Sequence, residues 1–101
     1  MSKEITKVRP TTNLSLQEPP QYRVIYVNDN VTTIEFVIKS LIDIFNYEEA
    51  AATDITITIH DEGSAVVAVL PYEIAEQKGV EATQMARANG YPLVIKLEAD
   101  A

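Results

Sequence analysis

Hydrogen-bond acceptors gather at one point of this sequence. Asn28, Asp29 and Asn30 follow an apolar run and precede a helix start, and their amide and carboxylate oxygens all accept hydrogen bonds. The only imidazole, that of His60, comes later in the chain. Asn and Asp are common in tight turns because they bond to their own backbone, so a turn is the simplest interpretation of the cluster. The same groups could instead bind a metal ion, or a ligand that is cationic or donates hydrogen bonds.

Metal binding and catalysis both have weak support in the sequence. One His and no Cys make a poor transition-metal site, and the acidic residues do not have the spacing of a Ca²⁺ loop. The chain has three glycines, no P-loop, no G-x-S-x-G motif and no evident nucleophile to pair with His60. We therefore expect no metal, no cofactor and no enzymatic activity. A metal-dependent hydrolase that uses Asp29 and His60 is a distant alternative.

The net charge of −7 is unevenly distributed along the chain. Residues 1–20 have a net charge of +1, whereas residues 21–101 carry five basic and thirteen acidic side chains. An acidic domain repels phosphate backbones, so we expect no nucleic-acid partner, and a cationic partner is favoured. No apolar run is long enough to span a membrane, and no secretory signal is evident. The absence of cysteine excludes disulfides and agrees with a cytoplasmic location.

The acceptor cluster precedes a strongly predicted helix. Thr32 and Glu35 form a T-x-x-E capping box, with Thr32 as the N-cap residue, and Val31 and Phe36 take the two positions of a hydrophobic staple. Apolar residues then recur at helical spacing as far as Phe45, which predicts a helix with one buried face.

The other elements differ in how clearly they are predicted. Strands are predicted over residues 21–28, 64–70 and 91–98, and a helix from Pro71 to about Asn89, with Gly90 as its stop. Between them, "EEAAATD" favours a helical turn, but "ITITIH" alternates Ile and Thr as a strand does. Periodicity alone therefore predicts a short helix followed by a strand at this point.

The domain organisation is simple. Residues 1–20 mix Thr, Ser, Pro and charged residues without a regular period and end at Pro19-Pro20, which predicts a flexible N-terminal extension. Residues 21–101 form one small domain, and strands alternating with helices predict an α+β fold.

Several segments together resemble the ClpS family, adaptors that deliver N-degron substrates to a ClpA-type AAA+ unfoldase and its ClpP protease. They are "PPQYRVIYVNDNVTTIEFVIKSLIDIFNY", the isolated His60, the turn at Gly63, "EIAEQK" and the closing "YPLVIKLE". The resemblance covers residues 19 to about 98. It implies a three-stranded antiparallel sheet packed against three helices in the order β-α-α-β-α-β, as in the C-terminal domain of ribosomal protein L7/L12. It also makes residues 48 to about 60 one continuous helix, which we prefer to the strand.

The resemblance also implies a ligand and the residues that bind it. Asn28, Asp29 and His60 would accept hydrogen bonds from the free α-amino group of a substrate whose first residue is Leu, Phe, Tyr or Trp. That side chain would enter an apolar pocket formed by Thr32, Ile34, Val37, Thr56, Ile59 and Leu93. The chain departs from the family at Asn30, where a second Asp is usual, and at Ile34 and Thr56, where Met is usual, which leaves the selectivity of the pocket open.

Partners follow from the same resemblance. Glu73 and Lys78 would contact the N-terminal domain of a ClpA- or ClpC-type unfoldase, which would engage residues 1–20 during transfer. The chain would then be a monomeric, non-enzymatic adaptor in the bacterial cytoplasm, with the plastid stroma as a second location. The alternative function is an interaction module like the L7/L12 domain, without recognition of an N-terminal amine.

Overall fold

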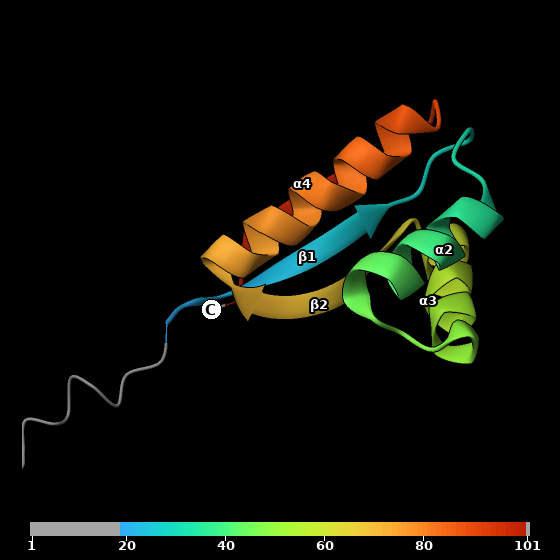
Figure 1. Ribbon diagram of the computed structural model, residues 1–101. Coiled ribbons are helices and arrows are strands. Elements are labelled where there is room, and N and C mark those ends of the chain that lie inside the picture. The colour runs from blue at the N-terminus through green and yellow to red at the C-terminus, as the bar shows by residue number, and fades with distance from the viewer. Residues whose placement is uncertain (1–18, 101) are drawn as a thin grey trace, which may run out of the picture.

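The computed structural model describes residues 19–100. Residues 1–18 and 101 lie outside the described residues, so the predicted extension over residues 1–20 stays a prediction. The elements follow one another as β1 (Gln21–Val27), α2 (Ile34–Phe45), α3 (Glu49–Glu62), β2 (Ser64–Pro71), α4 (Tyr72–Ala88) and β3 (Val94–Ala99) (Figure 1). The predicted α+β fold and its order of elements are confirmed.

The strands form one antiparallel sheet in the order β2-β1-β3. Val24 and Tyr26 of the central strand are completely buried, whereas Val66 and Val69 of β2 are exposed. In Figure 1, α4 runs along β1, while α2 and α3 lie against each other and contact β2. The helices therefore cover one face of the sheet, and the other face meets solvent, as is usual for an antiparallel sheet.

A polar pair lies inside the core. The Tyr26 hydroxyl is 2.8 Å from Ser40 Oγ, and both residues are fully buried. Ser40 donates its own proton to the carbonyl of Val37 at 2.8 Å, so Tyr26 must be the donor of the first bond. Burial raises the pKa of Tyr26 to about 12, although the hydrogen bond with Ser40 acts in the opposite direction. The pair is thus neutral and satisfied, and it joins β1 to α2.

Helix α2 begins one residue later than the capping box predicts. Thr33 is the N-cap residue, and its Oγ1 accepts a hydrogen bond from the Phe36 amide at 3.1 Å. The prediction of Thr32 as N-cap, with Val31 in a hydrophobic staple, is wrong. The Thr32 hydroxyl donates to Asp29 instead, and Val31 is 58% exposed.

The segment that alternates Ile and Thr is helical, so the strand that periodicity predicted is wrong and the helix that the resemblance implied is confirmed. Helix α3 buries Ala52, Thr56 and Ile59 on one face. The hydroxyls of Thr53, Thr56 and Thr58 each donate to the carbonyl four residues earlier, so they are satisfied within the helix. The helix ends at Gly63, whose φ of 93° is one that glycine adopts readily.

Small side chains bring α4 close to the sheet. Its buried residues are Ala75, Gly79, Ala82 and Ala86. The helix begins at Tyr72, so Pro71, which was predicted in its first turn, is instead the N-cap residue and the last residue of β2. At the other end, the backbone amides of Asn89 and Gly90 donate hydrogen bonds to carbonyls of the last turn, in agreement with the predicted stop at Gly90. No helix within residues 19–100 is both long and apolar enough to cross a membrane.

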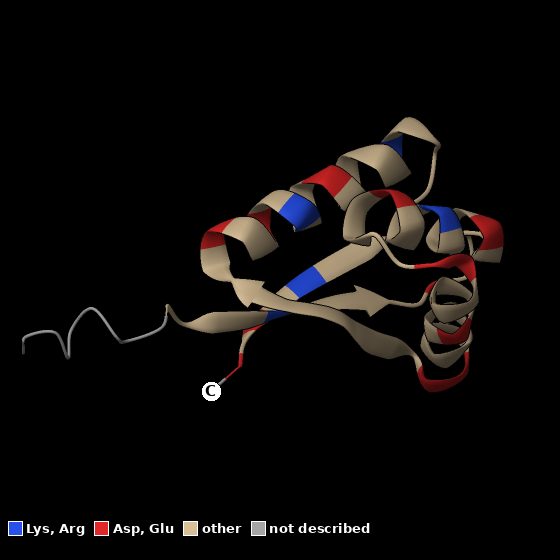
Figure 2. Cartoon of the chain, turned by 60° about the horizontal axis from the view of Figure 1, so that its bottom comes forward, with Lys and Arg blue, Asp and Glu red and all other residues tan. Residues whose placement is uncertain are grey.

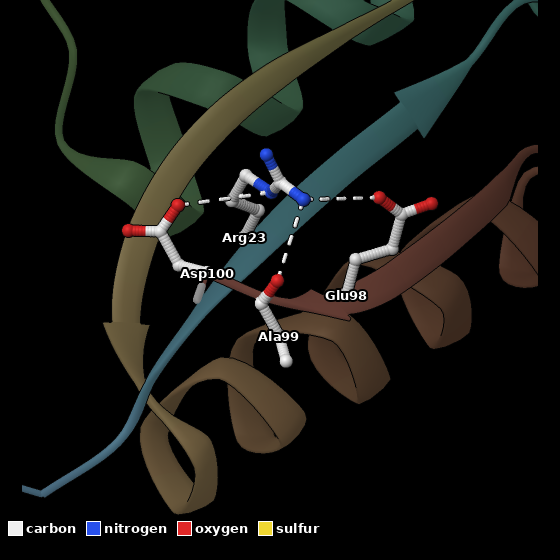
Figure 3. Close-up of polar contacts among 4 residues, drawn as sticks. All are labelled: Arg23, Glu98, Ala99 and Asp100. Carbon is white, nitrogen blue, oxygen red and sulfur yellow. Dashed lines mark hydrogen bonds and ion pairs between the residues drawn. The ribbon is translucent and has the colours of Figure 1, made fainter.

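Arg23 joins the two ends of the described chain (Figure 3). Its Nη2 donates to the Ala99 carbonyl at 3.3 Å and lies 3.5 Å from the Glu98 carboxylate, while Nε lies 3.8 Å from Asp100. The Asp100 amide donates to the carbonyl of Gln21 at 2.9 Å. The start of β1 and the end of β3 are therefore held together on the solvent side of the sheet.

Candidate ligand-binding site

A cavity of about 300 Å³ opens where the loop after β1 meets the start of α2 and the end of α3. This volume is at the lower end of the range for small-molecule sites. The cavity is lined by Asn28, Asp29, Asn30, Thr32, Ile34, Val37, Thr56, Ile59 and His60. All three predicted amine-binding residues and five of the six predicted pocket residues are among them. The sixth, Leu93, is fully buried and does not line the cavity.

Asp29 organises the loop at the mouth of the cavity. Its Oδ1 accepts hydrogen bonds from the amides of Val31 at 2.8 Å and Thr32 at 2.7 Å, and its Oδ2 accepts one from the Thr32 hydroxyl at 2.7 Å. The turn interpretation therefore holds for this side chain. Partial burial alone would raise the pKa of Asp29, but the bonds from Thr32 and Val31 and the charge of Arg87 outweigh it and lower that pKa. The carboxylate is negative at neutral pH.

His60 reaches the same cavity from the last turn of α3. The backbone N–H of Asn28 donates to the backbone carbonyl of Gly63 at 2.9 Å. This bond holds the loop after β1 against the end of α3. The imidazole is largely exposed, and its Nδ1 lies 3.3 Å from an oxygen of Asp61. The imidazole, an amide and a carboxylate from two distant segments thus converge on one opening.

The deeper part of the cavity is apolar. Val37 and Ile59 are almost fully buried, and Thr56 donates its hydroxyl proton to the Ala52 carbonyl at 2.7 Å. Ile34 is 47% exposed and forms part of the rim. Exposed hydrogen-bond acceptors and buried aliphatic side chains therefore line the same cavity.

The structure adds two residues that sequence reasoning did not identify. Arg87 donates from Nη1 to the carbonyls of Tyr91 and Leu93, both at 2.9 Å, and so holds the turn between α4 and β3. The Tyr91 ring packs against Phe36 with a centroid distance of 5.0 Å, and its hydroxyl accepts a hydrogen bond from Thr33 at 3.4 Å. This turn thus supports the start of α2. No local sequence pattern indicates these contacts, since Tyr91 and Thr33 are 58 residues apart.

The predicted unfoldase contacts lie away from the cavity. Glu73 is exposed in the first turn of α4, beside Pro19 and Pro20, and Lys78 follows on the same helix. The loop with Asp29 follows the opposite end of β1 (Figure 1). Two separate surfaces are therefore available for two different partners.

Negative charge predominates on the side of α3. This helix carries Glu49, Asp54, Asp61 and Glu62 but no Lys or Arg (Figure 2). The acidic end of α3 adjoins the cavity mouth, so the local field favours a cationic ligand. Among the described residues no group of three or more His, Cys, Asp or Glu side chains is arranged to hold a metal ion.

Comparisons with known proteins identify similar chains. The family model for ATP-dependent Clp protease adaptor protein ClpS matches residues 17–96. Three relatives carry the name ATP-dependent Clp protease adapter protein ClpS. The relative from Clostridium acetobutylicum is 43% identical over 82 residues, which are 81% of this chain and 81% of that protein. Those from Ruegeria and Shewanella piezotolerans are 40% and 37% identical and match 95% and 96% of this chain, with 81% and 95% of their own lengths covered.

A solved structure is similar over most of the chain. It is that of Agrobacterium tumefaciens ClpS2 bound to L-phenylalaninamide, with a TM-score of 0.80 and 37% sequence identity. The match covers 82% of this chain and 100% of that chain.

Proposed function

Because the chain belongs to the ClpS family of Clp protease adaptors, we propose that its cavity binds the first residue of substrate proteins. The family resemblance predicted from the sequence is confirmed. The proposed ligand is a free α-amino group next to the side chain of Leu, Phe, Tyr or Trp. The bound substrate would then be delivered to a ClpA- or ClpC-type unfoldase and degraded by ClpP.

One observation carries this proposal: hydrogen-bond acceptors and the buried side chains of Val37 and Ile59 line the same cavity. An α-ammonium group has only donors, and with a pKa of about 7.7–8.0 it is mostly charged at neutral pH. The carboxylate of Asp29, the amide oxygen of Asn28 and a ring nitrogen of His60 can accept from those donors. The similar ClpS2 structure holds L-phenylalaninamide, a compound that combines a free α-amino group with an aromatic side chain.

Both halves of the ligand are needed for useful affinity. Burial of a Leu or Phe side chain contributes about 1.5–3 kcal/mol. A hydrogen bond to a charged group contributes about 1.5–3 kcal/mol. Part of the combined free energy from burial and hydrogen bonds offsets the entropy lost on binding. A peptide with only one of the two features should therefore bind weakly.

A panel of peptides labelled at the C-terminus and differing only in residue one tests the proposal. Fluorescence anisotropy should show tight binding for Leu, Phe, Tyr and Trp and weak binding for Gly and Lys. N-acetylation of the Leu peptide should abolish binding, because it removes the charge and two donors. Equal binding across the panel, or tight binding of the acetylated peptide, would contradict the proposal and favour an interaction module without amine recognition.

Variants locate the site. His60→Ala should weaken binding of the Leu peptide, whereas Val80→Ala, at an exposed position on α4, should leave it unchanged. An unchanged affinity in His60→Ala would remove the imidazole from the proposed site.

Delivery requires a second surface, for which we propose Glu73 and Lys78. Calorimetry with the isolated N-terminal domain of a ClpA- or ClpC-type unfoldase should show weaker binding for Glu73→Lys and Lys78→Glu, while binding of the Leu peptide stays the same. The adaptor would act without catalysis, as a monomer and in the bacterial cytoplasm. Light scattering and cell fractionation test the last two statements.

A further inference from the structure

Thr32 directs its polar atoms toward Asp29. Its amide donates to Asp29 Oδ1 at 2.7 Å and its hydroxyl donates to Oδ2 at 2.7 Å. The resemblance placed this residue in the apolar wall, and it does line the cavity. Its hydroxyl proton, however, is engaged with the carboxylate and is not available to a ligand.

The acceptor capacity of Asp29 is nearly full before any ligand binds. An ionised carboxylate offers about four lone-pair sites. Two amide donors, those of Val31 and Thr32, occupy Oδ1, and the Thr32 hydroxyl occupies one site of Oδ2. The remaining site lies on Oδ2, so this oxygen is the one that can receive a further donor. Because both oxygens are held, the orientation of the carboxyl plane is fixed in advance.

We propose that Thr32 is a positioning residue that holds Asp29 Oδ2 ready for the ligand's α-ammonium group and makes no polar contact with the ligand itself. This inference rests on the proposed function of the cavity. It differs from a packing role because it depends on the hydroxyl of Thr32 and not on its methyl group. A residue that acts only through Asp29 loses its effect when the negative charge of Asp29 is removed.

Other charged groups also face Asp29 and must stay constant in any test. The guanidinium of Arg87 approaches from α4, and His60 faces the same cavity from α3. Loss of the Thr32 hydroxyl removes one hydrogen bond from the ionised form of Asp29, which raises the pKa of this carboxyl. This change in the pKa of Asp29 can be measured on the carboxyl itself.

The test is a double-mutant cycle in the full chain, with the Leu-started peptide as the probe. Thr32→Val keeps the shape of the side chain and removes the hydroxyl, Thr32→Ser keeps the hydroxyl, and Asp29→Asn removes the charge. We expect Thr32→Val to weaken binding about 10-fold at pH 7. Thr32→Ser should stay within about 2-fold of the wild type on the same reasoning. In the Asp29→Asn background, Thr32→Val should change affinity less than about 2-fold because the carboxylate is gone.

Three outcomes would overturn the inference while the proposed function stands. They are an unchanged affinity in Thr32→Val, an equally weakened Thr32→Ser, or the same loss in both Asp29 backgrounds. Failure of the wild-type protein to distinguish free from acetylated peptide would instead overturn the proposed function.

A measurement on the ligand-free protein tests the inference even if the substitutions alter the shape of the cavity. An NMR titration of the Asp29 carboxyl carbon should show a higher pKa in Thr32→Val and Thr32→Ala than in the wild type. An unchanged titration in folded variants, with folding checked by circular dichroism, would contradict the positioning role.

Discussion

Two hollows of similar size lie on this domain, and they differ in what surrounds them. The cavity beside Asp29 encloses about 300 Å³, and a groove between α4 and β3 encloses about 260 Å³. The cavity has a carboxylate, amides and an imidazole at its mouth, whereas the groove is lined mainly by apolar atoms around Gly79, Val80, Ile95 and Leu97. Volume alone therefore does not identify a binding site; convergent polar groups do.

One residue that lines the groove is a glycine of α4. Gly79 lies in the middle of α4 and is fully buried, and a Cβ atom there would meet Ile95 Cγ2 at 3.8 Å and Leu97 Cδ2 at 3.9 Å. These are ordinary van der Waals distances, so the groove has room for a methyl group. The comparison separates a hollow where polar groups converge from one that is lined mainly by apolar atoms.

The largest effect is expected from removing the negative charge of Asp29, which distinguishes the cavity from the groove. Asp29→Asn keeps an oxygen that can accept the amides of Val31 and Thr32 but eliminates the negative charge. Binding of a free-amine Leu peptide should weaken roughly 10- to 100-fold, which corresponds to the loss of about 1.5–3 kcal/mol for a charge-assisted bond. Anisotropy titrations measure the change. Equal affinity of the two proteins would show that the carboxylate only builds the turn.

The next effect concerns the segment that supports the cavity. Arg87→Met removes two hydrogen bonds to the carbonyls of Tyr91 and Leu93 and should destabilise the domain by about 1–2 kcal/mol in urea unfolding. Lys78→Met removes a charge from the same helix at a distance from this turn, and it should stay within about 0.5 kcal/mol of the wild type. Similar losses in both variants would mean that the turn is held by other contacts.

Adding a methyl group in the groove should raise the stability of the domain and leave its affinity for the Leu peptide unchanged. Gly79→Ala improves the helix propensity of α4 by about 0.8–1.0 kcal/mol, and its methyl group contacts Ile95 and Leu97 without a clash. We expect a rise in Tm of about 4–8 °C for each kcal/mol in a domain of this size, together with unchanged affinity for the Leu peptide. A lower Tm would indicate that α4 needs the glycine for close packing. Weaker peptide binding would indicate that the two hollows are coupled.

The smallest expected effect is the pH dependence of stability that comes from Asp29. Its pKa is lowered in the folded state, so its contribution is fully present above the unfolded value of about 3.9 and is lost as pH falls through the lower folded value. Acid unfolding below about pH 4 should therefore be steeper in the wild type than in Asp29→Asn, which has no titrating group at this position. Parallel curves would show that the carboxyl has the same pKa in the folded and unfolded states. Because the side chain is partly exposed, the difference should be small.

Much of the fold could be predicted where short-range patterns and packing agree. Helix α2 follows from its apolar periodicity, and Gly90 follows the end of α4 as expected. The three strands overlap the segments predicted for them, although β3 begins at Val94 and not at residue 91. Helix α3 could not be predicted in this way, because its Ile and Thr residues alternate as in a strand. Its helical state depends on the burial of Ala52, Thr56 and Ile59 against neighbouring elements, which periodicity within the segment does not reveal.

The candidate site shows the same division. The sequence by itself determined which groups are present: acceptors at residues 28–30, one imidazole, and a negative charge over the domain. Only the tertiary structure decided that His60 lies at the same opening as Asp29 and that Thr32 donates to the carboxylate instead of capping the helix. It also decided that Leu93 is buried and does not line the cavity. The physical reason is the distance along the chain over which each kind of interaction acts. Residue types and periodicity record local preferences, whereas the partner of a hydroxyl or a carboxylate depends on which segments the burial of apolar surface brings together.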